Sequence, residues 1–141
     1  MSQENVETVR RLFEAASDGD VGILFQAADP DCRVYPRPEE PDAATEYRGL
    51  DGLMEYLTNW YGQWDEYESE PLEIIDAGEQ VLVISRERGR VGRTGIEVVE
   101  DFWHSFVLRG GKFLEWHMYD GRAEALEAVG LSEQDIHGHT D

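Results

Sequence analysis

Two adjacent glycines, Gly110 and Gly111, separate two stretches in which apolar and polar residues alternate, residues 96–109 and 113–120. Alternation with a period of two indicates β-strands. A two-residue Gly-Gly connection favours a tight hairpin, because both central positions of such a turn need a positive φ. The sequence therefore predicts two neighbouring antiparallel strands whose register can be counted from the glycines.

This register determines which side chains lie next to each other. Counting back from the glycines, the opposed pairs are Arg109 with Lys112, Leu108 with Phe113, Phe106 with Glu115, His104 with His117, and Phe102 with Tyr119. Directly opposed residues have Cβ atoms about 4.5–5.5 Å apart, and these pairs share one face of the sheet. We therefore expect His104 and His117 to be neighbours, with Glu100 and Glu115 further along the same surface.

The other face of the predicted hairpin is also apolar. In the same register it carries Trp103, Val107, Leu114, Trp116 and Met118. An antiparallel sheet that is apolar on both sides needs two covers. Helices can supply one cover, and we expect a homodimer through the outer sheet face to supply the other.

The first part of the chain has helical spacing. Apolar residues predict a helix from Ser2 to a stop at Gly19, then a short helix that Asp20 caps and that ends before Pro30. A third helix follows Arg48, and its apolar positions repeat on one side at Leu53, Leu57, Trp60 and Trp64.

After the third helix the period changes to two. The sequence predicts strands at residues 72–75 and 81–90 before the hairpin, a short strand at 32–35, and a last helix at 122–129. Helices followed by an antiparallel meander indicate an α+β fold. We expect one domain over residues 1–131, a surface loop at 36–45 and a frayed tail at 132–141.

Charge and cysteine content exclude several classes of protein. The formal net charge of −19 would repel nucleic acids and anionic membrane surfaces, so we expect neither partner. The single cysteine, Cys32, rules out an intrachain disulfide, and we expect it to be a small buried hydrophobe. Without an apolar leader or spanning segment, the chain is expected in the cytoplasm.

The two histidines allow three interpretations. One histidine is a general base or acid, since imidazole titrates near neutral pH. Alternatively, both bind a metal together with Glu115 or Glu100. In the third interpretation they are hydrogen-bonded within a core pocket or lie exposed on a strand. The arginines of the preceding strand and turn are expected on a solvated face, paired with Glu87 and Glu97; they are Arg86, Arg88, Arg90 and Arg93.

Several segments together resemble the SnoaL-like domain of the nuclear transport factor 2-like superfamily. They are MSQENVETVRRLFEAASDGD, DPDCRVYPRP, EYRGLDGLMEYLTNW, DAGEQVLV, FWHSFVLRGGKF and YDGRAEALEAVGL. The resemblance extends from Val6 to Leu131. It implies a cone-shaped, cystatin-like α+β barrel, in which a curved, largely antiparallel sheet wraps around N-terminal helices, encloses a pocket and commonly forms dimers.

The resemblance also bears on individual residues. His104 matches an inward-facing histidine that is common in such sequences, and His117 stands nearest to the acid/base aspartate of the polyketide cyclases. The aspartate base of the ketosteroid isomerases precedes a proline, and here Tyr35 holds that position. The Arg/Asp arrangement of the epoxide hydrolases has no match.

We therefore expect acid/base chemistry on a small hydrophobic molecule, without a cofactor or metal: a cyclisation, isomerisation or hydration. His104 is the expected base, His117 its partner or the acid, and Tyr119 and Tyr35 orient the substrate. The remaining pocket residues are expected to be Phe102, Phe106, Glu115, Glu100, Trp60 and Tyr56.

The alternatives are a non-catalytic dimer that binds a small ligand and a scaffold with a filled interior. Imidazole nitrogens facing a void would favour catalysis, whereas nitrogens engaged in core hydrogen bonds would favour binding.

Overall fold

The computed structural model describes residues 2–38 and 44–132. Within these residues the helices are α1 (Ser2–Asp18), α2 (Val21–Gln26), α3 (Gly49–Tyr61) and α4 (Arg122–Val129). The strands are β1 (Ala28–Tyr35), β2 (Tyr47–Arg48), β3 (Trp64–Asp76), β4 (Gln80–Val91), β5 (Glu97–Arg109) and β6 (Lys112–Tyr119).

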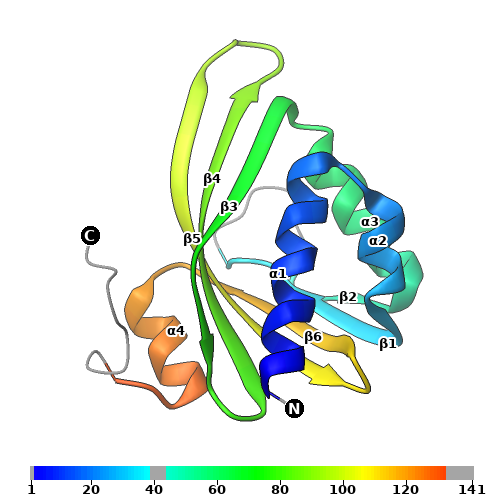
Figure 1. The fold of residues 1–141 in the computed structure, drawn as a ribbon. Helices are drawn as coiled ribbons and strands as arrows, with labels where there is room; N and C mark the ends of the chain where they lie inside the picture. Colours follow the sequence, from blue (N-terminus) through cyan, green and yellow to red (C-terminus); the bar gives the residue numbers. More distant parts are fainter. Residues whose placement is uncertain (1, 39–43, 133–141) are drawn as a thin grey trace.

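The strands form one curved sheet in the order β2-β1-β6-β5-β4-β3 (Figure 1). The predicted antiparallel meander is confirmed from β3 to β6, where each strand pairs with the next. β1 pairs in parallel with β6, and β2 pairs antiparallel with β1. The sheet curves around α1, α2 and α3, and α4 lies on its opposite side, which gives the expected α+β cone (Figure 1).

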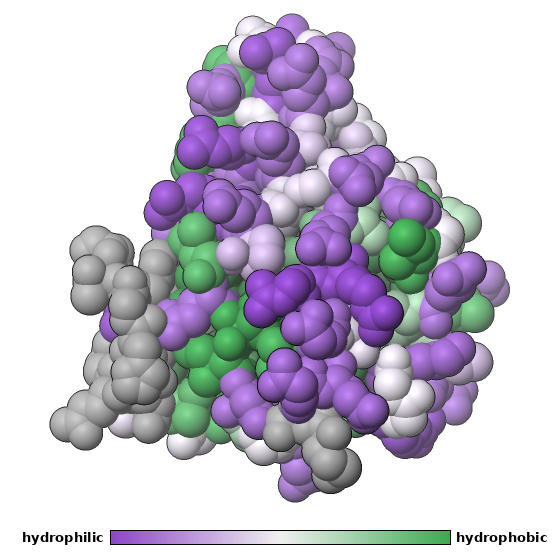
Figure 2. All heavy atoms as spheres, in the orientation of Figure 1, coloured by the Kyte–Doolittle hydropathy of each residue, from purple (hydrophilic) through white to green (hydrophobic). Residues whose placement is uncertain are grey.

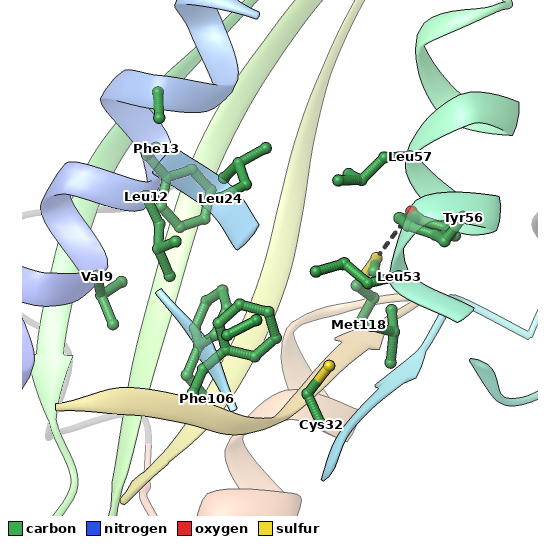
Figure 3. Close-up of a cluster of buried hydrophobic side chains, with 14 of the residues drawn as sticks. Val9, Leu12, Phe13, Leu24, Cys32, Leu53, Tyr56, Leu57, Phe106 and Met118 are labelled. Atoms are coloured by element: carbon green, nitrogen blue, oxygen red, sulfur yellow. Dashed lines mark hydrogen bonds between the residues drawn. The ribbon is translucent and has the colours of Figure 1, made fainter. Parts of the chain in front are cut away.

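Apolar side chains from the helices and the sheet meet on the concave side. Figure 3 shows this core, to which α1 and α3 contribute from two sides and β5 and β6 from below: Val9, Leu12, Phe13, Leu53, Tyr56, Leu57, Phe106 and Met118. The hydroxyl of Tyr56 donates to Sδ of Met118 at 3.3 Å. Cys32 is fully buried in the same core, as predicted.

The outer face of the sheet is covered in part by α4. Leu82, Ile84 and Trp103 are buried there against Ala125 and Leu126 of that helix. Figure 2 shows apolar surface beside this cluster, between α1 and α4 over the lower part of β3 and β4. The chain thus covers part of this face itself, and the second copy that we expected there stays a prediction.

The predicted ends of α1 and α4 are confirmed, but α2 and α3 end earlier than predicted. α2 stops at Gln26, and β1 begins at Ala28, before Pro30. α1 ends before Gly19, and Asp20 caps α2 by accepting a hydrogen bond from the backbone N–H of Ile23 at 3.2 Å. Trp64, however, is the first residue of β3 and does not extend α3. Part of the predicted loop and nearly all of the predicted tail lie outside the described residues.

An extra residue in β6 changes the predicted register. Gly110 and Gly111 have φ values of +59° and +80° and form the expected loop. The register then shifts at Leu114, which has no opposite residue and forms a β-bulge. The pairs at this end of the hairpin are Arg109 with Lys112, Leu108 with Phe113 and Val107 with Glu115.

The bulge turns the rest of β6 to faces opposite to those predicted, because side chains alternate with a period of two. The predicted pairing of His104 with His117 is therefore wrong: His104 is opposite Met118, and His117 is opposite Ser105. The pairings of Phe106 with Glu115 and of Phe102 with Tyr119 are wrong for the same reason. Trp116 and Met118 join the concave core, whereas the outer face receives Glu115, His117 and Tyr119.

We predict that Gly89→Ala destabilises the fold by about 1–3 kcal/mol. A Cβ on Gly89 would lie 2.3 Å from Cε3 of Trp64, so the indole ring has to move. Urea unfolding measures the loss, and tryptophan fluorescence reports the displacement. Gly22→Ala is the control, since its added Cβ meets only Oδ1 of Asp20, at 3.5 Å. A Gly89→Ala variant as stable as the parent would contradict this prediction.

Candidate functional site

A cavity lies between the concave face of the sheet and the helices α1 and α3. The centres of water molecules can occupy about 50 Å³ of this cavity. That volume holds roughly three to five waters. Most of its wall is apolar, and four of its polar side chains lie on the neighbouring strands β3, β4 and β5. These are Tyr67, Ser69, Glu87 and His104.

A second space adjoins this cavity, and we call it the mouth. By the same measure its volume is about 140 Å³. Four residues line both spaces, Trp60, Tyr67, Glu87 and Phe102. The residues that line the mouth alone include Arg37, Gln63, Trp64 and Glu100. Glu87 therefore stands where the inner cavity and the mouth meet.

The structure brings together about half of the predicted pocket residues. Tyr56, Trp60, Phe102 and Phe106 line the inner cavity together with His104, and Glu100 lines the mouth. The other predicted residues lie on the outer face of the sheet or at its edge: Tyr35, Glu115, His117 and Tyr119.

His104 is buried, and both of its ring nitrogens are hydrogen-bonded. Nε1 of Trp116 donates to Nδ1 of His104 at 3.1 Å. An indole N–H can only donate, so Nδ1 carries no proton and the neutral ring is protonated at Nε2. Nε2 lies 3.0 Å from Oγ of Ser85 and donates to it. Neither nitrogen is free to take a proton from a ligand.

The surroundings of His104 keep its ring neutral. Burial lowers its pKa from 6.5 to about 3, and the positive charge of Arg37 acts in the same direction. Phe13 of α1 packs edge-on against the ring, with the centroids 5.2 Å apart. An apolar wall disfavours the charged form of a base, so this histidine stays uncharged near neutral pH.

Glu87 of β4 is the buried carboxylate of the site, and its side chain is 7% exposed. Three hydroxyl groups donate to it: Tyr67 to Oε1, and Ser69 (at 2.9 Å) and Ser85 to Oε2. Burial raises the pKa of Glu87, while the three hydrogen bonds and the charge of Arg37 oppose that increase. The carboxylate is therefore fixed in position and takes up a proton more readily than an exposed glutamate does.

The hydrogen bonds form a continuous chain from α1 to β6. Oγ of Ser17 lies 2.6 Å from both the backbone N and O of Ser69, which ties α1 to β3. Ser69 bonds Glu87, Ser85 bonds both Glu87 and His104, and Trp116 closes the chain. Because every member is bonded to its neighbours, the chain holds β3, β4, β5 and β6 in one arrangement.

His117 belongs to a different environment, on the outer face of the sheet. Its Nε2 lies 2.8 Å from Oε1 of Glu115, and its ring stacks on Tyr35 with the centroids 4.4 Å apart. Tyr35 in turn donates to Oε2 of Glu46 at 3.1 Å. Since His104 and His117 lie on opposite faces, they cannot share a proton or a metal ion.

The sequence argument missed the polar end of the cavity. It placed Glu87 among surface arginines, but Arg86 pairs with Asp101 at 2.8 Å and Arg90 with Glu66 at 3.4 Å. Tyr67 and Ser69 were missed because β3 begins earlier than predicted. Arg37 has no signal in the sequence, since its position follows from tertiary contacts.

No metal site is found in residues 2–38 and 44–132. These residues contain no group of three or more His, Cys, Asp and Glu side chains that could hold an ion. No helix in this part of the chain is long and apolar enough to cross a bilayer.

Solved structures share this fold across most of their length. An NTF2-like protein of unknown function from Burkholderia pseudomallei has a TM-score of 0.73 at 22% identity, covering 89% of this chain and 97% of that protein. TerC, co-crystallised with polyporic acid, has a TM-score of 0.73 at 21% identity, covering 90% and 98%. A candidate SnoaL-like polyketide cyclase from Jannaschia sp. has a TM-score of 0.73 at 19% identity, covering 92% and 94%.

At such identities these likenesses establish the fold alone. Among curated proteins, none matches the chain. The family model of the SnoaL-like domain matches residues 9–116, most of the sequence and nearly every element that builds the cavity. The chain therefore belongs to the SnoaL-like domain family.

Proposed function

We propose that this protein is an acid/base enzyme that moves a proton on a small, largely apolar molecule, and that Glu87 carries the proton. The observation that supports this best is a buried carboxylate, fixed by three hydroxyls, in the wall of an apolar cavity. Glu87 takes a proton from a carbon next to a carbonyl group and returns it to another atom. An isomerisation or a cyclisation of this kind consumes no net acid or base.

The hydrogen bonds leave Glu87 able to accept this proton. A carboxylate oxygen has two acceptor positions, and among the described residues Oε1 receives a hydrogen bond from Tyr67 alone. Burial, which raises the pKa of Glu87, also makes the carboxylate a stronger base. Its place between the inner cavity and the mouth gives it access to a ligand in either space.

In this proposal His104 is a positioning residue rather than the base that the sequence suggested. Its two nitrogens are engaged by Trp116 and Ser85, so it acts on the ligand only through Glu87. By donating to Ser85 it directs the hydroxyl hydrogen of Ser85 toward Glu87. His117 and Tyr119, on the outer face, have no part in the reaction.

The engaged nitrogens of His104 also favour the second candidate, a protein that binds a small molecule without turnover. Both candidates need a small, largely apolar ligand, and one structural neighbour, TerC, was co-crystallised with an organic molecule, polyporic acid. Whether Glu87 transfers a proton distinguishes the enzyme from the binding protein. The homodimer and the cytoplasmic location stay predictions of both.

We predict that Glu87→Gln strongly slows proton transfer and leaves ligand binding intact. Small aromatic ketones that raise the melting temperature are incubated with the protein in D₂O, and NMR follows the exchange of protons next to the carbonyl. The parent protein should accelerate this exchange, and Glu87→Gln should slow it about 10²–10⁴-fold. The parent rate should rise with pH through a midpoint above 4.5, because the base must be ionised.

Glu66→Gln is the matched control for that variant, since it changes an exposed glutamate of β3 that pairs with Arg90. It should leave the exchange rate unchanged. If bound ketones exchange no faster than in buffer, the protein is a binder without this activity. If Glu87→Gln exchanges as fast as the parent, another group is the base.

We predict that His104→Gln makes the free energy of unfolding less dependent on pH. Between pH 6.5 and about 3 the unfolded chain protonates this histidine and the folded chain does not. Stability is therefore lost as the pH falls through this window, by about 1.4 kcal/mol per pH unit from this group. Glutamine can donate to Ser85 and accept from Trp116 but does not titrate. Urea unfolding between pH 4.5 and 7 measures how the free energy of unfolding changes with pH in the parent and in His104→Gln. Equal slopes in the two proteins would contradict a neutral His104.

A further inference from the structure

We propose that the mouth binds the carboxylate of an acidic substrate through Arg37 and Trp64, while the apolar part of the molecule lies in the inner cavity. The inference names the substrate class of the same site and thus rests on the proposed function. It is carried by two buried donors that have no acceptor among the described residues.

Nε of Arg37 and Nε1 of Trp64 are these two donors. Both atoms are buried without a hydrogen-bond partner in the described part of the chain, and both residues line the mouth. A buried N–H without an acceptor costs about 1–3 kcal/mol, more for a charged group, so native structures keep few of them. Two such groups beside one space indicate that a ligand supplies the acceptor.

The guanidinium of Arg37 is already held in place for this task. It lies over the ring of Phe102, with Cζ 4.1 Å from the centroid, and the side chain is 19% exposed. Nη1 donates to Oε2 of Glu100 at 3.0 Å. The side of the guanidinium that carries Nε is left without a described acceptor, and a carboxylate fits that side with two parallel hydrogen bonds.

A carboxylate fits the mouth better than a neutral acceptor does. Arg37 faces two carboxylates of the mouth, the half-exposed Glu100 and the buried Glu87. An anion is therefore favoured by charge-assisted hydrogen bonds to the guanidinium and not by an excess of positive charge. The net charge of −19 repels anions in general, but at 0.1 M salt this field is screened beyond about 10 Å. Direct contact with Arg37 therefore decides the binding of an anion that has reached the mouth.

The volume of the inner cavity limits the size of the apolar part of the substrate. Three to five waters displace about 90–150 Å³ of liquid, which is the size of one small ring. Trp60 and Phe102, which line both spaces, form aromatic walls between the ring and the carboxylate. Glu87 lines the same two spaces, so the atoms that join ring and carboxylate pass beside the proposed base.

The test compares acids with neutral molecules of the same shape. The acids are phenylacetate, 3-phenylpropanoate and 4-phenylbutanoate, and the neutral partner of each is the corresponding alcohol. Titrations of ¹⁵N-labelled protein give each dissociation constant and follow the indole N–H of Trp64, assigned as the signal missing in Trp64→Phe. We expect one acid to bind about 10–100-fold more tightly than its alcohol and to shift the Trp64 signal downfield.

Arg37→Met should reduce this preference to about onefold, because it keeps the stem over Phe102 and removes the charge and the donors. Arg90→Met is the matched control: it removes one arginine and one ion pair, with Glu66, outside the mouth, and should keep the full preference. Arg37→Lys keeps the charge without the Nε donor and should fall between the two. Arg37→Lys also tests the role of Arg37 if Arg37→Met does not fold.

Several results would overturn the proposal. The first is that acids and alcohols bind equally, and the second is that no acid binds at millimolar concentration. The others are that both Arg37 variants keep the full preference for the acid over its alcohol, or that Arg90→Met loses it as well. Glu87→Gln separates this inference from the proposed function. It should bind the acid at least as tightly as the parent does, even though it no longer exchanges protons.

Discussion

The site depends on one constraint, that the indole N–H of Trp116 can only donate a hydrogen bond. Because it donates to Nδ1 of His104, the neutral imidazole must carry its proton on Nε2, which then donates to Ser85. Ser85 has one hydroxyl hydrogen, so it directs that hydrogen to Glu87. The direction of the hydrogen bonds from Trp116 through His104 and Ser85 to Glu87 follows from this first donor. The chain ends on the carboxylate between the two spaces, and its order explains why the carboxylate, rather than the histidine, is the group that can react.

The hairpin shows how far the sequence predicts this arrangement. The two glycines correctly predict the loop and the first two pairs, but not the bulge at Leu114. A signal was present, because the adjacent apolar residues Phe113 and Leu114 break an alternation that continues with apolar Trp116 and polar His117. It went unnoticed because both faces of this sheet carry apolar residues, so polarity did not reveal which face was inside. An error of one residue was enough to place His117 in the site and Trp116 outside it.

Glu87 was predictable from the same kind of pattern. Arg86 and Arg88 were expected on a solvated face, and a residue between them on a strand has to point the other way. The sequence argument paired Glu87 with its neighbours along the chain instead of following the alternation from Val83. The position of Arg37 is different. It comes from a proline-rich segment without periodicity, and its guanidinium is held at the mouth by packing on Phe102 and by the hydrogen bond to Glu100.

The same cone serves unrelated reactions in other proteins, so the fold does not determine the chemistry. In this chain the inward-facing acid is Glu87, which lies on β4. The carboxylate of Glu87, next to the edge strand β3, lies where the inner cavity and the mouth meet. A molecule that enters with its apolar end first therefore passes the carboxylate and leaves its polar end near Arg37. Depth, charge and the hydrogen-bond chain then select one orientation of an amphipathic ligand, which a uniformly apolar cavity could not do.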